Sequence, residues 1–384
     1  MTAELKVLRS IGDVAAHDWD ALANPPEQAF NPFVAHAFLK ALEDSGSAAV
    51  RTGWQSVHLT LTDGDALVGA APAYAKSHSQ GEYVFDYGWA DAFERAGGSY
   101  YPKLQISAPF TPATGPRLLA RDDETRRGLL GAAEALARSN QLSSVHITFQ
   151  TEAEWRLAAE AGWLSRMDRQ FHWTDKGYGD FAGFLTSLNS DKRKNLRKER
   201  LKALEAGIEI EWVTGRDLTE AHWDAFFAFY MDTGSRKWGS PYLTRRFFSL
   251  VSAAMNERIL LVMAKREGRY IAGALNFIGG DTLYGRNWGA IEHHPFLHFE
   301  VCYYQAIDFA LAKGLKRVEA GAQGEHKLLR GYEPVATYSS HYITHPGLRQ
   351  AVGNYLTRER QAIEADIEAL SEATPFRKDL RGAR

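Results

Sequence analysis

The sequence predicts an α/β fold made of two tandem units, each a mixed sheet with helices on both faces. Residues 31–42 and 240–251 both begin with a polar residue and Pro and continue with apolar residues at helical spacing, 209 positions apart. Residues 57–76 and 259–278 both read as an apolar strand, a Gly-containing turn and a second apolar strand. Two similar patterns in the same order indicate an internal duplication, and their sequence of elements is typical of mixed sheets.

A third and weaker repeat completes the pattern and suggests where the domains lie. A helix expected over residues 124–139 precedes a strand at 144–149, and a helix expected over 297–313 precedes a strand at 316–320. Gly and Pro mark an insert in the first unit and a boundary near residue 176. The expected bounds are a first domain over 1–175 with an aromatic insert over 81–119, a second domain over 176–345 that carries the reaction centre, and a charged C-terminal helix and tail over 346–384.

The composition indicates a globular protein and excludes several classes. The 384 residues are 45% hydrophobic and 24% charged, and the formal net charge of −2 does not suit a general polyanion binder. Cys302 is the only cysteine, which excludes a disulfide framework and a cysteine-rich zinc site. The N-terminus has no leader-like apolar run and no stretch is long and apolar enough to span a bilayer. We therefore expect a cytoplasmic protein that could also contact the cytoplasmic membrane peripherally.

Cations crowd the first half of a helix expected to run to Gly207, with Ser190 or Asp191 as its cap. They are Lys192, Arg193, Lys194, Arg197 and Lys198. Because the N-terminal end of a helix dipole favours anions, these cations suit a bound phosphate. The alternative is a solvated helix face, which is what most charge runs are.

A second segment with chemical potential follows the strand expected over residues 282–288. His294 and His298 lie four apart, but this spacing alone is a weak metal signal and no third ligand is evident, so we expect no metal. A general base is the better interpretation, since His298 or Glu300 could accept a proton from an amine. The alternative is that His298 and neighbouring tyrosines such as Tyr303 belong to the core.

The third segment, residues 319–332, reads EAGAQGEHKLLRGY. Gly324 lets the backbone approach a ligand, and Glu325, His326 and Lys327 place three ionisable groups at the carboxyl end of a strand. The alternative is a Gly-rich turn with solvated charges. The sequence has no GxxxxGK[ST], no GxGxxG after a strand and no GxSxG, which counts against nucleotide-dependent chemistry and against a serine hydrolase.

Several segments resemble the FemAB-like branch of the GNAT acyltransferase superfamily, which is labelled peptidoglycan biosynthesis or recognition. They are NPFVAHAFLKALEDSGSA, GEYVFDYGWADAFERAG, YYPKLQISAPFTPATGPRLL, KRKNLRKERLKAL, LHFEVCYYQAIDFAL and GAQGEHKLLRGYEP. The resemblance covers about residues 30–345 and implies two tandem GNAT-like domains that transfer an acyl group to an amine. It also implies a role for Lys327, which matches a lysine close to the reacting carbonyl in Fem-type relatives.

The resemblance leaves a choice of donor. Fem-type enzymes use aminoacyl-tRNA and a cell-wall precursor, but those with a tRNA role carry a long helical arm that this sequence lacks. We therefore expect acyl-CoA as co-substrate and no permanently bound cofactor. We expect no DNA partner, and tRNA is disfavoured as a donor. One candidate acceptor is the long-chain sphingoid base of bacterial ceramide formation. The alternatives are a Fem-type aminoacyl transferase using aminoacyl-tRNA and a non-catalytic module that binds a cell-wall or lipid headgroup.

Each candidate residue has an expected role in such a transfer. Proton removal is assigned to Glu300 or His298, with Glu325 or His326 in reserve, and Lys327 would stabilise the oxyanion. The donor is expected to contact Lys192, Arg193, Arg197 and Gly324. The substrate cleft is expected to contain Tyr100, Tyr101, Phe110, Trp288 and Tyr303.

Overall fold

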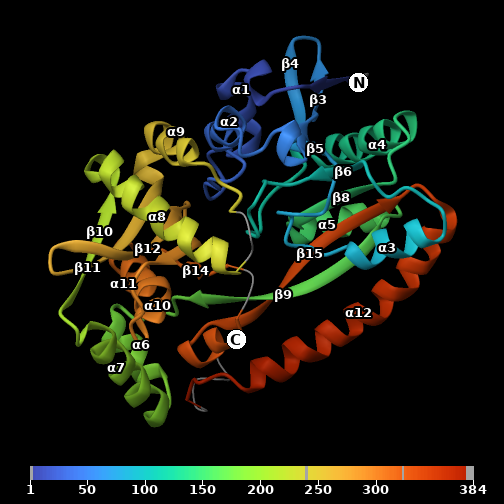
Figure 1. Ribbon diagram of the computed structural model, residues 1–384. Coiled ribbons are helices and arrows are strands. Elements are labelled where there is room, and N and C mark those ends of the chain that lie inside the picture. Colours follow the sequence, from blue (N-terminus) through green and yellow to red (C-terminus); the bar gives the residue numbers. More distant parts are fainter. Residues whose placement is uncertain (1–2, 238–240, 322–323, 378–384) are drawn as a thin grey trace. The chain divides into compact units, whose positions relative to one another are not determined.

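The computed structural model describes residues 3–237, 241–321 and 324–377 and confirms mixed sheets with helices and a long C-terminal helix (Figure 1). The chain divides into two compact units, residues 1–168 with 336–365 and residues 169–335 with 366–384. It passes from one unit to the other within β9 (Leu164–Thr174), β15 (Glu333–Ile343) and α12 (Pro346–Glu372). In the described part of the chain, none of the helices has the length and apolar character needed to cross a membrane.

The first unit contains two sheets. Its strands are β1 (Glu4–Leu8), β2 (Trp54–Ser56), β3 (His58–Asp63), β4 (Ala66–Ala71), β5 (Ala73–Lys76), β6 (Lys103–Ile106), β7 (Leu119–Ala120) and β8 (Ser144–Gln150), and its helices are α1 (Ala16–Ala23), α2 (His36–Asp44), α3 (Tyr87–Arg95), α4 (Asp123–Ser139) and α5 (Glu152–Glu160). One sheet has the antiparallel order β1-β3-β4-β7, and in the other β2, β5, β6 and β8 are successive neighbours. Strands β6 and β8 pair in parallel because α4 carries the chain back between them.

The second unit contains one sheet in the order β10-β11-β12-β13-β14-β9. Its strands are β10 (Ile208–Thr214), β11 (Ile259–Arg266), β12 (Arg269–Ile278), β13 (Thr282–Ala290) and β14 (Arg317–Glu319), and its helices are α6 (Phe181–Ser187), α7 (Ser190–Leu204), α8 (Glu220–Lys237), α9 (Arg245–Met255), α10 (Leu297–Phe299) and α11 (Gln305–Lys313). The pairs are antiparallel except β13 with β14, which are joined by the α10–α11 crossover. A hairpin followed by a parallel crossover therefore occurs in both units.

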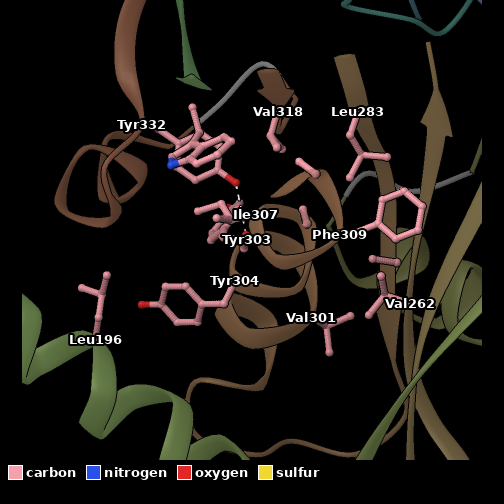
Figure 2. Close-up of a cluster of buried hydrophobic side chains, with 14 of the residues drawn as sticks. Leu196, Val262, Leu283, Val301, Tyr303, Tyr304, Ile307, Phe309, Val318 and Tyr332 are labelled. Atoms are coloured by element: carbon pink, nitrogen blue, oxygen red, sulfur yellow. Dashed lines mark hydrogen bonds between the residues drawn. The ribbon is translucent and has the colours of Figure 1, made fainter. Parts of the chain in front are cut away.

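The sheet of the second unit has helices on both faces, as alternation along β12 shows. Ala272 and Ala274 pack into the apolar cluster that contains α11, whereas a Cβ added at Gly273 would meet Phe226 of α8 at 3.3 Å. On β13, a Cβ at Gly289 would lie 2.2 Å from the backbone of Phe229, so glycine is needed where α8 crosses. The cluster around α11 is drawn in Figure 2.

The two helices expected to begin at a polar residue and Pro start later than predicted. The side chain of Asn31 accepts from the backbone N–H of Phe33 at 3.0 Å and stabilises a turn, so α2 begins only at His36. In the second repeat Ser240 lies outside the described residues, and α9 begins at Arg245 with the preceding Thr as its cap. The repeated helices exist, and in the first repeat a turn takes the place of the predicted first residues.

Candidate active site

A pocket of about 530 Å³ lies in the second unit where β13 ends and the chain turns toward α10. Its lining consists of Thr233, Trp288 and residues 290–299. The rings of Trp288 and His298 are 5.2 Å apart, and Phe296 adopts a positive φ of 64°, which is strained for an aromatic residue. The wall is therefore aromatic, with imidazoles among the rings, which suits a ligand pocket.

A π-helical turn, Glu300–Tyr304, follows α10 directly. Such turns in otherwise α-helical segments occur frequently at functional sites. In this one the hydroxyl of Tyr303 lies 2.9 Å from Nε2 of His326. The His326 ring also lies 5.5 Å from Phe299 and 6.3 Å from His298, both of which line the pocket. The third segment predicted from the sequence thus meets the second at the edge of the pocket.

Lys327 is almost fully buried beside the exposed His326. Its Nζ donates to the carbonyl of Gly321 at 2.8 Å, and burial lowers the pKa of the ammonium from its ordinary 10.5 to about 7. The pKa of His326 is also lowered, by burial and by the charges of Arg330 and Lys327. Near pH 7 the site therefore offers a neutral imidazole next to an amine that can carry or release a proton.

The contacts of Glu300 fit a structural role better than the predicted role of general base. Its side chain is fully buried, with Oε2 accepting from Arg200 at 3.0 Å and Oε1 accepting from Arg200 at 2.8 Å and from Gln305 at 2.7 Å. Arg200 also pairs with Asp308 at 2.7 Å. A carboxylate whose two oxygens are both held by donors is poorly placed to take a proton from a substrate amine.

The basic helix is α7, and its cap is Asn189 instead of the predicted Ser190 or Asp191. The Asn189 side chain accepts from the N–H of Lys192 at 3.0 Å, which satisfies one of the free N–H groups of the first turn. Lys192 and Arg193 are half-buried and Arg197 is exposed. Within the described ranges no ion pair involves these three cations, so their charge is available to an anionic ligand.

Two further predicted residues lie beside His326. Gly324 adopts a φ of 114°, and a Cβ there would come within 2.4 Å of the His326 ring, so this glycine makes room for the imidazole. Glu325 is exposed and pairs with Arg169 at 3.3 Å. Residues 322 and 323 of the same segment lie outside the described residues.

The predicted aromatic residues of the insert belong to the first unit and have local partners there. Tyr100 is buried and donates to Asp86 at 2.7 Å, and the hydroxyl of Tyr101 lies 2.8 Å from that of Ser79. Phe110 is buried against Trp54 at 5.1 Å. The structure thus brings Trp288 and Tyr303, but not Tyr100, Tyr101 and Phe110, into one unit with the ionisable candidates.

The sequence interpretation missed two residues that contact the His326 turn. Arg330 donates to the carbonyl of His326 and to Glu199 on α7. Arg330 is four residues beyond His326, and Glu199 is the one acid of α7 beyond its first turn, where cations surround it, so the sequence offered a signal for both. In the described parts of the chain there is no group of three or more His, Cys, Asp or Glu side chains that could hold a metal ion.

Comparison with known proteins places the chain in a family. The model of the FemAB-like family, described as peptidoglycan biosynthesis/recognition, matches residues 10–378. No curated protein sequence matches.

Solved structures share the fold at low sequence identity. The crystal structure of FemX has a TM-score of 0.56 at 12% identity and covers 88% of this chain and 98% of its own. L-PGS from Bacillus licheniformis has a TM-score of 0.51 at 9% identity, covering 87% and 99%. The C-terminal domain of a putative lysylphosphatidylglycerol synthetase from Agrobacterium fabrum has a TM-score of 0.50 at 9% identity, covering 88% and 95%. The family match over nearly the whole chain and the shared fold agree with the sequence resemblance, and the chain belongs to the FemAB-like family.

Proposed function

We propose that this protein is an amide-forming transferase of the Fem type, which moves an aminoacyl group from aminoacyl-tRNA to the primary amine of a cell-wall or lipid precursor. The observation that supports it best is the position of His326 beside an aromatic pocket in the second unit, with the buried Lys327 next to it in the chain. His326 is hydrogen-bonded to Tyr303 beside the pocket-lining His298 and Phe299, and the buried Lys327 follows it in the chain.

The reaction needs a base for the attacking amine and a positive charge for the developing oxyanion. One nitrogen of His326 is held by Tyr303, and the other takes a proton from the acceptor amine as its nitrogen attacks the aminoacyl carbonyl carbon. The ammonium of Lys327 stabilises the tetrahedral oxyanion. When the intermediate collapses, the ester C–O bond breaks and the ribose hydroxyl leaves with the proton that His326 took up. The products are an amide and uncharged tRNA, so atoms and charge balance.

The donor in this proposal differs from the one expected from the sequence. Acyl-CoA, with a sphingoid base as acceptor, has no support from the comparisons. The FemX-like fold instead supports the aminoacyl alternative, whose donor is the tRNA that the sequence interpretation disfavoured. Three cations of α7, Lys192, Arg193 and Arg197, would then contact donor phosphates. Acyl-CoA remains a prediction that the same assay tests.

The test is a transfer assay with matched donors. The purified chain is incubated with mixed aminoacyl-tRNAs carrying radiolabelled amino acids or with acyl-CoA, and with amino-bearing cell-wall precursors or aminolipids. Label in a product stable to mild base reports an amide. Transfer from aminoacyl-tRNA by the wild-type protein, together with loss of this transfer in Lys327→Met, supports the proposal. If thiol is released from acyl-CoA with the same acceptors and no transfer occurs from tRNA, acyl-CoA is the donor and the aminoacyl-tRNA proposal is wrong. If no transfer occurs from either donor, the proposed function is refuted.

A further inference from the structure

His326 and Lys327 lie in the helical turn Glu325–Arg330, and the last residue of this turn, Arg330, connects it to α7 through hydrogen bonds. NH1 of Arg330 donates to the His326 carbonyl at 2.7 Å, and NH2 donates to both carboxylate oxygens of Glu199, at 3.0 and 2.9 Å. The Arg330 guanidinium is nearly buried and lies 3.5 Å from the ring centre of Phe299, a pocket residue. One planar side chain thus contacts the turn, the pocket wall and α7.

Glu199 on α7 is the carboxylate to which Arg330 binds. It also accepts a hydrogen bond from the Tyr304 hydroxyl, so the π-helical turn and the Glu325–Arg330 turn share one carboxylate on α7. In Figure 2 the ring of Tyr304 extends toward α7, where Leu196 packs against the same core. Because the Glu199 side chain is only 18% exposed and that of Arg330 6%, this ion pair is little screened by water.

We propose that Arg330 is a positioning residue for the transfer step, and that Glu199 is its anchor on α7: together they hold the turn so that His326 faces Tyr303 and the pocket. The inference rests on the proposed function of His326 and Lys327. It adds that the geometry of the base depends on a pair of residues 131 positions apart, neither of which contacts the reacting atoms. A displacement of about 1 Å in a reacting group can cost on the order of 100-fold in rate.

The same pair sets the electrostatic surroundings of the imidazole. The groups around His326 are Tyr303, His298, Lys327, its neighbour Glu325, which pairs with Arg169, and Arg330. The positive charge of Arg330 lowers the His326 pKa, so its removal raises that pKa. Neutralising Glu199 has the opposite effect, because it leaves the Arg330 charge uncompensated. A loss of packing alone would not shift the pKa in opposite directions in the two variants.

The experiment compares Arg330→Gln, Glu199→Gln and the double variant with wild type. The expected result for Arg330→Gln is a fall in kcat of about 10- to 100-fold with the acceptor KM changed less than about threefold. Arg330→Lys keeps the charge but cannot make both hydrogen bonds, so it recovers only part of kcat. The matched control is Arg245→Gln, which removes an exposed arginine–carboxylate pair between α8 and α9 and should leave kcat unchanged.

The pKa of His326 is followed by NMR, with its ring signals assigned through His326→Gln. We expect a higher pKa in Arg330→Gln, a lower one in Glu199→Gln and an intermediate one in the double variant. Unchanged kcat and an unchanged titration in Arg330→Gln would overturn the proposal. If that variant does not fold, Glu199→Gln decides by the same two readouts. The titration needs no turnover, so it separates a failure of this inference from a failure of the proposed function.

Discussion

Replacing Lys327 by methionine should stabilise the protein while removing its activity. Burial lowers the pKa of Lys327 from 10.5 to about 7, a fall of about 3.5, and each pKa unit corresponds to about 1.36 kcal/mol. The native state therefore bears a cost of about 5 kcal/mol for this ammonium. Methionine has a similar unbranched shape without the charge. Losing the hydrogen bond to Gly321 costs about 1 kcal/mol, which leaves a net gain of about 4 kcal/mol below pH 7.

The pH dependence of this gain identifies its cause. Below about pH 7 lysine is charged in both the folded and the unfolded state, and the whole cost is present. Between pH 7 and 10.5 the folded state releases the proton first, so wild-type stability rises with pH and the advantage of Lys327→Met shrinks. At pH 9 the remaining cost is about 2 kcal/mol, and the net gain falls to about 1 kcal/mol.

The assay is urea unfolding of wild type and Lys327→Met at pH 6.5 and pH 9, with midpoint and slope recorded for both. Lys327→Arg is the control, because arginine stays charged and cannot lower its cost by releasing a proton. A Lys327→Met variant that is less stable than wild type at pH 6.5 would refute the reasoning. So would a stability difference that does not change with pH.

Three further outcomes follow from the site. Transfer by wild type should fall as pH rises through about 7, because Lys327 loses the proton that stabilises the oxyanion, and this fall should be absent from the pH profile of Lys327→Arg. Glu300→Gln should lower the free energy of unfolding by about 3 kcal/mol, because it leaves the Arg200 charge less well paired. Turnover per folded molecule should stay within about threefold of wild type. A loss of turnover beyond about 100-fold would instead support Glu300 as the general base. Replacing Lys192, Arg193 and Arg197 together by glutamine should reduce the salt slope of tRNA binding by about 2, as measured by filter binding from 50 to 200 mM salt, and an unchanged slope would exclude α7 as the donor contact.

The local elements of the fold could be predicted because their signals lie in short stretches of sequence. The hairpin turn at Glu267-Gly268 has positive φ at both residues, and a Gly between two apolar runs indicates such a turn directly. Strand β13 and helix α12 begin at Thr282 and Pro346, as expected. The helix starts near Asn31 and Ser190 were predicted less well, because a polar residue can stabilise either a turn or a cap.

The partners of the site residues could not be predicted, because they come from distant parts of the chain. Glu300 reads as a free carboxylate in the sequence, and only the packing of α7 against the π-helical turn shows that Arg200 holds it. Similarly, the sequence leaves open that Lys327 is a solvated charge, and its lowered pKa follows from burial that only the fold provides. The sequence therefore predicts that the chemistry lies in the second unit, and the contacts of each side chain indicate which role it suits.

Mass spectrometry of single-turnover products would decide whether the second unit makes amides from an aminoacyl donor. Excess wild-type protein is mixed with one aminoacyl-tRNA and an amine acceptor and quenched, and the acceptor is analysed for a mass increase of one aminoacyl residue. We predict that increase on the acceptor nitrogen with wild type and its absence with Lys327→Met. An unmodified acceptor with wild type, or equal modification by Lys327→Met, would contradict the proposed function.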